Sequence, residues 1–238
     1  MAKIRILDEE WSWKTTTLQQ YLDEGNIPSH WKSLFEEEEL REILKNISEN
    51  ISKDRIVFPP PNRVFRAFSI PMEKIKVVIL GQDCYHDGNA VGICFSVPLG
   101  GKINPSLVNI YNELESEGYK PKRNGDLSPW VNQGCIMLNR ALTVEKGNPE
   151  SHLSYWYPFS ERVLKYISEN TCNVAWLLMG KHAASFKEYT ESNGHKAFIT
   201  SHPSPLSAYR KYQNYPAFIG SGIFKEINNF LGEKKIDW

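Results

Sequence analysis

Four short apolar runs constrain the fold of this chain more than any other feature. The runs are residues 77–80, 136–138, 174–178 and 197–200, and each has the length of a buried strand. Helical patterns lie between and after these runs, at residues 106–117, 159–168, 183–191 and 222–231. Strands that alternate with helices form mainly parallel sheets whose two faces are covered. We therefore predict an α/β protein, a three-layer α/β/α sandwich with a central four-stranded parallel sheet.

The chain before the first apolar run divides near residue 30. From residue 31 to 51 apolar side chains recur at helical spacing, and the glutamates 36–39 form a solvated face of this predicted helix. Prolines at 59–61 then end the helix and impose an extended connection. Residues 1–30 are polar and mixed, with few apolar anchors. We predict a main domain at 31–238 and an N-terminal extension at 1–30 that packs across it, with no chemistry assigned to the extension.

Charge, cysteines and histidines narrow the class of protein. The chain has 28 Lys plus Arg and 28 Asp plus Glu, so its formal net charge is zero. A neutral protein binds DNA only if its positive side chains gather on one face, so composition neither supports nor excludes a nucleic acid. The four cysteines form no CxxC pair, and the six histidines lack metal-ligand spacing. We therefore expect reduced thiols and no metal or other cofactor.

The sequence contains no recognisable signal peptide or membrane segment. Its apolar stretches fall short of the roughly 18–20 residues that span a bilayer. We therefore expect an intracellular protein that is not secreted and does not bind a membrane. The nucleus, the cytoplasm and a viral replication site are all compatible with the sequence.

Each predicted strand is followed by a polar, turn-forming segment. The first strand leads into Gly81-Gln82-Asp83-Cys84-Tyr85-His86, and the second leads into Asn139. The third leads into Gly180-Lys181-His182, and the fourth leads into Ser201-His202-Pro203-Ser204-Pro205-Leu206-Ser207. Ligands of open parallel sheets bind beyond the carboxyl ends of the strands. We therefore expect a carboxylate (Asp83), an amide (Asn139) and a histidine (His202) to converge there, with Tyr85 and Phe95 as walls.

Each of these side chains also has a purely structural explanation. An aspartate shortly after a strand usually serves a turn or caps a helix. Asn139 could be a turn residue, and His202 could be a hydrogen-bonded structural histidine. Tyr85 and Phe95 would ordinarily belong to the core. The structural explanation weakens because all five residues would have to fall by coincidence at the same edge of the sheet.

Three ordered motifs resemble those of the family 1 uracil-DNA glycosylases. Gly81-Gln82-Asp83-x-Tyr85-His86 is similar to the water-activating motif of that family. Gly125-Asp126-Leu127-Ser128-x-Trp130 and Gln133-Gly134 through Leu138-Asn139 resemble the segment that leads to its uracil-reading asparagine. His202-Pro203-Ser204-Pro205-Leu206-Ser207 resembles its leucine loop. The resemblance covers the chain from about Trp31 to Trp238, so it implies that the main domain is a catalytic domain of this family.

The resemblance implies three catalytic residues. Asp83 would stabilise an oxocarbenium-like transition state and position the attacking water. His202, as a neutral donor, would bind O2 of the departing uracil, and Gln82 would bind the same region or the water. An aspartate with its ordinary pKa of about 3.9 is ionised at neutral pH, so Asp83 needs no raised pKa. Uracil would leave as a stabilised anion, which requires no metal or organic cofactor.

The resemblance also implies the residues that bind uracil and DNA. Phe95 would stack on the flipped base, Asn139 would bind its N3–H and O4 edge, and Tyr85 would exclude the methyl group of thymine. Leu206 would fill the vacated base stack as an apolar wedge. The other DNA contacts would be Ser106, Gly180, Lys181, Ser204 and Ser207. The serines could instead cap helices or form turns.

Four features depart from the family pattern. Cys84 stands where the family usually has proline, so the turn that carries Asp83 is expected to be less pre-organised. Lys181 stands where serine is usual, and it would contact phosphate as a point charge or point into solvent. The stretch from Tyr85 to Phe95 is one residue shorter than usual, and the proline-rich loop is reduced to residues 101–106.

These motifs leave three functional hypotheses. The first is an active glycosylase that removes uracil from single- or double-stranded DNA. The second is a scaffold of the same fold that binds DNA or a replication partner and has lost efficient catalysis. The third, a small-molecule nucleoside hydrolase, would not explain the Leu206 loop and its serines. The first hypothesis also allows inhibition by a DNA-mimicking protein and a replication or repair partner bound through residues 1–30.

Overall fold

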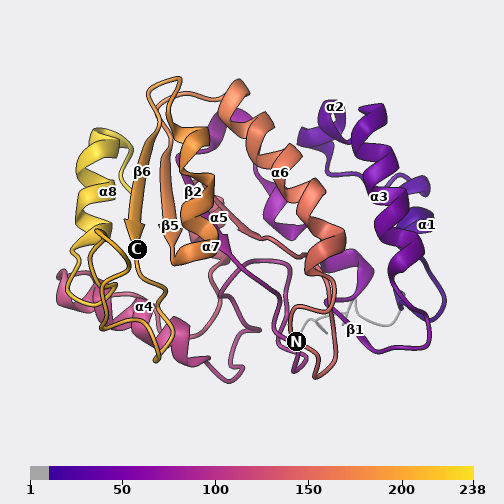
Figure 1. The fold of residues 1–238 in the computed structure, drawn as a ribbon, viewed down its shortest axis with the longest axis horizontal. Coiled ribbons are helices and arrows are strands. Elements are labelled where there is room, and N and C mark those ends of the chain that lie inside the picture. Colours follow the sequence, from indigo (N-terminus) through magenta and orange to yellow (C-terminus); the bar gives the residue numbers. More distant parts are fainter. Residues whose placement is uncertain (1–10) are drawn as a thin grey trace, which may run out of the picture.

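The computed structural model describes residues 11–238 and has a parallel sheet at its centre (Figure 1). Its strands are β2 (Val77–Gly81), β3 (Cys135–Asn139), β5 (Ala175–Met179) and β6 (Lys196–Thr200), in the order β3-β2-β5-β6. The first three of these are buried along their whole length, as expected for strands covered on both faces. All four predicted strands are confirmed, and their bounds differ from the prediction by one residue. The pairing places Gly81 opposite Asn139, so β2 and β3 end together.

Helices cover both faces of this sheet. The helices α4 (Pro105–Ser116) and α8 (Ile223–Leu231) lie on one side of it (Figure 1). The helix α6 (Leu153–Asn170) lies on the other side, and α3 (Glu38–Asn50) packs against α6. Buried residues recur at helical spacing along α4 and α8, which gives each helix one apolar stripe toward the core. This arrangement confirms the predicted three-layer α/β/α sandwich.

The helix predicted at 183–191 is wrong in its start and in most of its conformation. The helix α7 (Lys181–Ala184) begins two residues earlier, and the chain then tightens into a 3₁₀ helix at Ser185–Thr190. The Ser185 hydroxyl donates to the His182 carbonyl, and the Thr190 hydroxyl donates to the Lys187 carbonyl. These hydrogen bonds span three residues, and such local side-chain bonds compete with the α-helical pattern.

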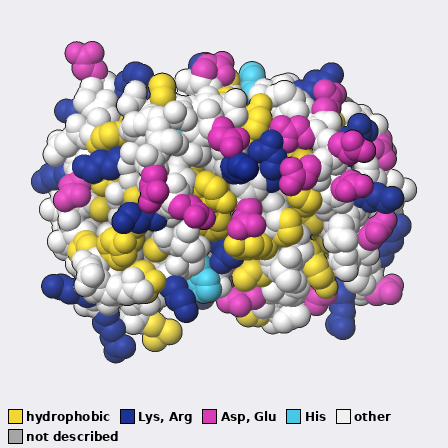
Figure 2. Space-filling model, turned by 45° about the horizontal axis from the view of Figure 1, so that its top comes forward, with side chains coloured by type: hydrophobic (Ala, Val, Ile, Leu, Met, Phe, Trp, Pro, Cys, Tyr) yellow, Lys and Arg dark blue, Asp and Glu magenta, His cyan; other side chains and the backbone are white. Residues whose placement is uncertain are grey.

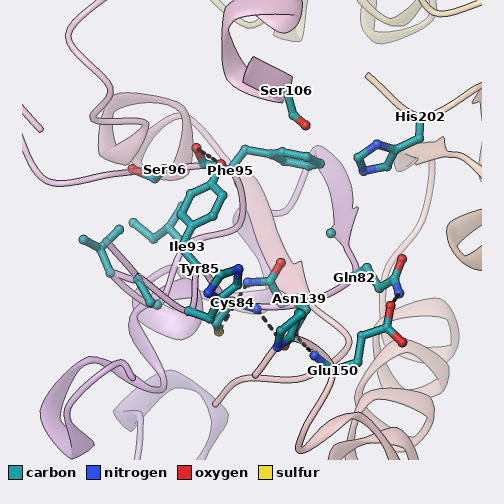
Figure 3. Close-up of a pocket in the computed structure, with 17 residues that line it drawn as sticks. Gln82, Cys84, Tyr85, Ile93, Phe95, Ser96, Ser106, Asn139, Glu150 and His202 are labelled. Atoms are coloured by element: carbon teal, nitrogen blue, oxygen red, sulfur yellow. Dashed lines mark hydrogen bonds between the residues drawn. The ribbon is translucent and has the colours of Figure 1, made fainter. Parts of the chain in front are cut away.

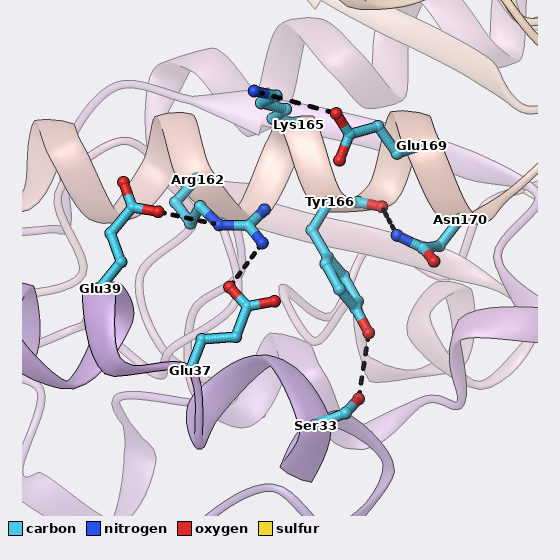
Figure 4. Close-up of polar contacts among 8 residues, drawn as sticks. All are labelled: Ser33, Glu37, Glu39, Arg162, Lys165, Tyr166, Glu169 and Asn170. Atoms are coloured by element: carbon cyan, nitrogen blue, oxygen red, sulfur yellow. Dashed lines mark hydrogen bonds and ion pairs between the residues drawn. The ribbon is translucent and has the colours of Figure 1, made fainter.

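The helix predicted at 31–51 is interrupted at Glu37. The helix α2 (Lys32–Phe35) ends before this residue, whose backbone is extended (ψ 134°), and α3 begins at Glu38. The interruption lets Glu37 reach α6, where Arg162 Nη2 lies 2.5 Å from its carboxylate and Arg162 Nε lies 3.6 Å from Glu39 (Figure 4). The predicted solvated face is confirmed for Glu36, Glu38 and Glu39, which are exposed, whereas Glu37 is half-buried. The Arg162 side chain is only 18% exposed, so its contact with Glu37 is partly shielded from solvent.

Residues 11–30 share the hydrophobic core of the rest of the chain. Trp13 is buried and donates from its indole nitrogen to the Pro59 carbonyl at 2.7 Å. The short helix α1 (Leu18–Asp23) begins with a capping box formed by Thr17 and Gln20, and it packs against α3. The predicted division into an N-terminal extension and a main domain at residue 30 stays a prediction. Residues 1–10 of the predicted extension lie outside the described residues.

The surface mixes charges of both signs. Figure 2 shows one face of the molecule, on which acidic and basic side chains are interspersed. Within residues 11–238, no helix is long and apolar enough to cross a membrane.

Candidate active site

A pocket of about 250 Å³ opens at the carboxyl edge of the sheet (Figure 3). The turn after β2, the end of β3, the segment after β6 and the first turn of α4 all contribute side chains to it. Seven residues predicted from the sequence line this pocket, namely Gln82, Asp83, Tyr85, Phe95, Ser106, Asn139 and His202. The tertiary structure therefore brings together residues that are up to 120 positions apart, from 82 to 202 in the chain.

Asp83 accepts backbone hydrogen bonds on both of its carboxylate oxygens. Oδ1 accepts from the Cys84 N–H at 2.9 Å, and Oδ2 accepts from the Glu150 N–H at 2.5 Å. Burial raises the pKa of Asp83 above its ordinary value, while these two N–H groups lower it. The negative charge of Glu150 also raises this pKa, and His86 lowers it. The bonds fix the direction in which the carboxylate faces.

Cys84 supports the Asp83 turn through a bond that proline cannot make. Its N–H is the donor to Asp83 Oδ1, and proline has no N–H. Cys84 lacks the stiff ring of a proline, but its N–H gives the Asp83 carboxylate a hydrogen bond that proline could not provide. The Cys84 side chain is buried, and its sulfur lies 3.3 Å from the Ala141 carbonyl oxygen and 3.5 Å from Asn139 Nδ2.

Tyr85 and Phe95 form two walls of the pocket and are bonded to each other. The Tyr85 hydroxyl donates to the Phe95 carbonyl at 3.1 Å. Burial raises the pKa of Tyr85, so its hydroxyl remains a neutral donor. The backbone of Phe95 is left-handed (φ 61°), a conformation that costs energy for a bulky residue and that is often found at functional sites. This strained backbone places the aromatic ring over the pocket, 6.1 Å from the His202 ring centre.

Asn139 is the last residue of β3 and lies against Gly81, the last residue of β2. A Cβ atom on Gly81 would lie 2.2 Å from Asn139 Oδ1 and 2.9 Å from the Cys94 Cβ, so any larger residue here would displace the Asn139 amide. The Asn139 side chain is 9% exposed and turns its amide into the pocket, as Figure 3 shows. An amide offers one acceptor and one donor group at this position.

His202 presents one defined nitrogen to the pocket. Its Nδ1 accepts from the Ser204 N–H at 3.0 Å, so the proton of the neutral ring belongs on Nε2. Burial lowers the pKa of His202, and the neighbouring His182 lowers it further. Both effects favour the neutral ring at neutral pH. This arrangement leaves Nε2 as the nitrogen that can donate, and the role of His202 toward a substrate stays a prediction.

A second cleft of about 380 Å³ adjoins the first and shares Gln82 and His202 with it. The cleft also contains four of the predicted DNA contacts, namely Gly180, Lys181, Ser204 and Ser207. A Cβ on Gly180, whose φ is 86°, would lie 2.9 Å from the His202 Cβ, so glycine allows the two segments to approach. Lys181 is exposed and makes no ion pair with any residue in the range 11–238.

The remaining predicted DNA contacts are Ser106, which lines the first pocket, and Leu206, which lines neither cleft. Leu206 is 83% exposed in the segment that follows β6, so its side chain is free to contact a ligand. Tyr209, three residues later, is also largely exposed. Ser106 stands in the first turn of α4, where free backbone N–H groups favour anions.

Glu150 contacts the site but belongs to none of the motifs found in the sequence. Besides its backbone bond to Asp83, its carboxylate accepts from Gln82 Nε2 at 2.6 Å (Figure 3). It lies in a polar loop between β4 (Val144–Glu145) and α6, where a single glutamate is no signal of function. Its left-handed backbone (φ 63°) could not be predicted from the sequence. In the described part of the chain, no group of three or more His, Cys, Asp or Glu could hold a metal ion.

The fold and the site define a class of protein: a three-layer α/β protein with a polar, aromatic-walled pocket at the carboxyl ends of its parallel strands. The family model described as the uracil DNA glycosylase superfamily matches residues 69–229. The chain belongs to this superfamily.

Curated relatives and solved structures agree with this assignment. A uracil-DNA glycosylase of Campylobacter fetus is 40% identical over 222 residues, which cover 89% of this chain and 93% of the relative. The crystal structure of mimivirus uracil-DNA glycosylase is similar with a TM-score of 0.82 and 27% identity, covering 94% of this chain and 90% of the other. A variant of the mimivirus protein in complex with UGI gives a TM-score of 0.80 and 28% identity, covering 88% and 86%.

Proposed function

We propose that this chain flips uracil out of DNA and hydrolyses its N-glycosidic bond, leaving an abasic site and free uracil. The observation that carries this proposal is the convergence of Asp83, Asn139 and His202 on one pocket. A carboxylate, an amide with a donor and an acceptor, and a neutral N–H donor are the groups this reaction needs. The likeness to relatives named uracil-DNA glycosylase supports the same substrate.

Extrusion of the nucleotide uses the rim of the site. Leu206 replaces the flipped base in the stack, because an apolar side chain fills that space without needing hydrogen-bond partners. The phosphates on either side are held by Ser106 at the start of α4 and by the second cleft with Gly180, Lys181, Ser204 and Ser207. These contacts hold the DNA backbone and do not read sequence. We expect single- and double-stranded DNA both to serve as substrates.

Recognition of the base uses the walls of the pocket. The flipped base stacks on Phe95, and the Asn139 amide accepts from N3–H and donates to O4. Tyr85 lies where C5 of the base must come, so the methyl group of thymine clashes with its ring. The bond from the Tyr85 hydroxyl to the Phe95 carbonyl keeps that ring in place.

Bond cleavage separates charge within the pocket. Positive charge develops on the sugar, where the Asp83 carboxylate stabilises it and holds the attacking water. Negative charge develops on the base, where His202 donates from Nε2 to O2. Gln82 lies beside both residues and binds the same region. The water adds to the sugar carbon as the bond to N1 of uracil breaks. The electron pair of that bond leaves with the uracil anion, and the proton that the water loses passes to the Asp83 carboxylate.

The scaffold alternative finds no support in this site. Every group that the reaction needs is present, and the Asp83 carboxylate keeps two backbone donors that fix its direction. A protein that only bound DNA would not require Asn139 or a buried, neutral His202.

Three further expectations remain proposals. A DNA-mimicking protein inhibitor would cover the Leu206 loop and the second cleft, since the mimivirus relative is known in complex with UGI. A replication or repair partner would bind through the N-terminal segment. An intracellular location follows from the proposed substrate, and the sequence leaves nucleus, cytoplasm and viral replication site open.

One assay tests the function. The protein is incubated in EDTA with a uracil-containing oligonucleotide, and abasic sites are measured by alkaline cleavage. We expect abasic sites at uracil, and none in the matched oligonucleotide with thymine. The absence of cleavage at all salt concentrations, with DNA binding intact, would favour the scaffold instead.

A further inference from the structure

The Cys84 sulfur lies between two groups of different hydrogen-bonding character. On one side, at 3.3 Å, is the carbonyl oxygen of Ala141, which can only accept. On the other side, at 3.5 Å, is the side-chain nitrogen of Asn139, which can only donate. All three residues are buried, and Cys84 and Asn139 also line the pocket.

The carbonyl determines the direction of both bonds. Because the Ala141 oxygen cannot donate, the thiol must direct its hydrogen toward it. The sulfur can then only accept a hydrogen bond from Asn139, so the NH₂ group of Asn139 must be the donor. The reversed amide would place its oxygen against the sulfur with no hydrogen between them. Burial raises the pKa of Cys84, which keeps the hydrogen on the sulfur at neutral pH.

The orientation of this amide decides which base fits the pocket. Figure 3 shows the Asn139 nitrogen turned toward Cys84 and the oxygen turned away from it. In this orientation the amide matches a base with N3–H and O4, which is uracil. Rotation by half a turn would present a donor to N3 and an acceptor to position 4, and cytosine is the base that carries the matching groups.

We propose that the Cys84 thiol is a specificity-determining residue that holds the Asn139 amide in the orientation that accepts uracil and rejects cytosine. The thiol is proposed to act through its contact with the Asn139 amide, so it is a positioning residue. The inference rests on the proposed function and adds the residue that enforces its choice between two bases. Proline at this position would have no hydrogen bond to offer Asn139, so this device is a property of the present chain.

The test compares Cys84→Ala with Cys84→Ser on oligonucleotides that contain uracil or cytosine. Cys84→Ala releases the amide, so kcat/KM for uracil should fall about fivefold, the change expected for one hydrogen bond. The rate of cytosine excision should rise. The ratio of cytosine to uracil excision should therefore increase by more than the fivefold that the slower uracil excision alone would cause. Cys84→Ser keeps a donor for Ala141 and an acceptor for Asn139, so it should restore the ratio.

Cys135→Ala is the matched control, because it removes another buried thiol that lies at the start of β3, the end of the strand opposite the pocket. Its cytosine-to-uracil ratio should equal that of the wild type. A ratio that stays unchanged in Cys84→Ala, with both rates reduced alike, would overturn the proposal. Failure of the wild type to release uracil would instead overturn the proposed function.

A binding measurement extends the test to a variant too weakened for kinetics. Free uracil and free cytosine are titrated into the wild type, Cys84→Ala and Cys84→Ser, and their dissociation constants are compared. We expect the preference for uracil over cytosine to shrink in Cys84→Ala and to return in Cys84→Ser. An equal preference in all three proteins would contradict a role in orientation.

Discussion

The backbone N–H of Glu150 donates a 2.5 Å hydrogen bond to Oδ2 of Asp83, across 67 positions of the chain. The same residue also accepts from Gln82 through its side chain at 2.6 Å. One loop residue thus positions two neighbouring groups of the site, through its backbone for Asp83 and through its carboxylate for Gln82. The two contacts can be separated by mutation, because a side-chain substitution leaves the backbone bond in place.

Glu150→Ala should lower kcat about fivefold, because it frees the Gln82 amide while Asp83 keeps its backbone donor. Glu150→Gln should retain most of the rate, since its amide oxygen still accepts from Gln82. The measurement is single-turnover release of uracil. A double variant of Gln82→Ala and Glu150→Ala should be no slower than Gln82→Ala alone. Independent, additive losses would show that Glu150 does not act through Gln82.

The pH dependence of kcat/KM should report the environment of Asp83. Burial raises the pKa of Asp83 above its ordinary value, and the reaction needs the ionised form, so activity is lost as the pH falls through this raised pKa. Burial lowers the pKa of His202 below 6.5, so protonation of this residue should occur only below that pH. Glu150→Gln removes a negative charge near Asp83 and should move the acid limb to lower pH. An acid limb that does not move would contradict this electrostatic coupling.

Asp83→Asn and His202→Leu should each abolish most of the rate while DNA binding remains. Loss of the carboxylate should cost roughly 100- to 10,000-fold in kcat, and loss of the N–H donor to O2 roughly 100- to 1000-fold. Binding of a non-hydrolysable uracil oligonucleotide, measured by fluorescence anisotropy, should change little. Parallel losses of binding and rate would mean that these residues hold the substrate and do not act on the bond.

Tyr85→Ala should admit thymine, because it opens the space that the methyl group needs. The measurement is release of thymine from an oligonucleotide with a single T·G mismatch. Tyr85→Phe is the control: it loses the hydroxyl bond to Phe95 but keeps the ring, so it should still reject thymine. Excision of thymine by both variants would assign the exclusion to the hydrogen bond and not to the ring.

Lys181→Ser should reduce the salt dependence of DNA binding. If Lys181 contacts a phosphate, the slope of log K against log salt should become shallower by about one unit. The exposed Lys45 on α3, remote from both clefts, supplies the control variant Lys45→Ser, whose slope should equal that of the wild type. Equal slopes for all three proteins would place Lys181 in solvent.

The pattern of apolar residues predicted the strands correctly, because their formation depends on the local sequence. It failed where contacts with distant residues determine the conformation of the backbone. The runs that form β2, β3, β5 and β6 are largely apolar. A short run of this kind is typical of a strand that is buried on both faces of a parallel sheet. The predicted helix at 31–51 failed at Glu37, because the carboxylate pairs with Arg162, 125 positions away. Periodicity holds no information about a partner at such a distance.

The sequence by itself determined which side chains stand at the ends of the strands, and therefore that Asp83, Asn139 and His202 share one edge of the sheet. This follows because parallel strands with apolar runs of similar length end together. The tertiary structure alone decided how these groups face one another. The Glu150 bond to Asp83, the left-handed Phe95, the Nδ1 bond of His202 and the Cys84 contact with Asn139 each depend on close packing of distant or strained segments. Hydrogen-bond directions in a buried site are set by all neighbours at once, and no single stretch of sequence contains them.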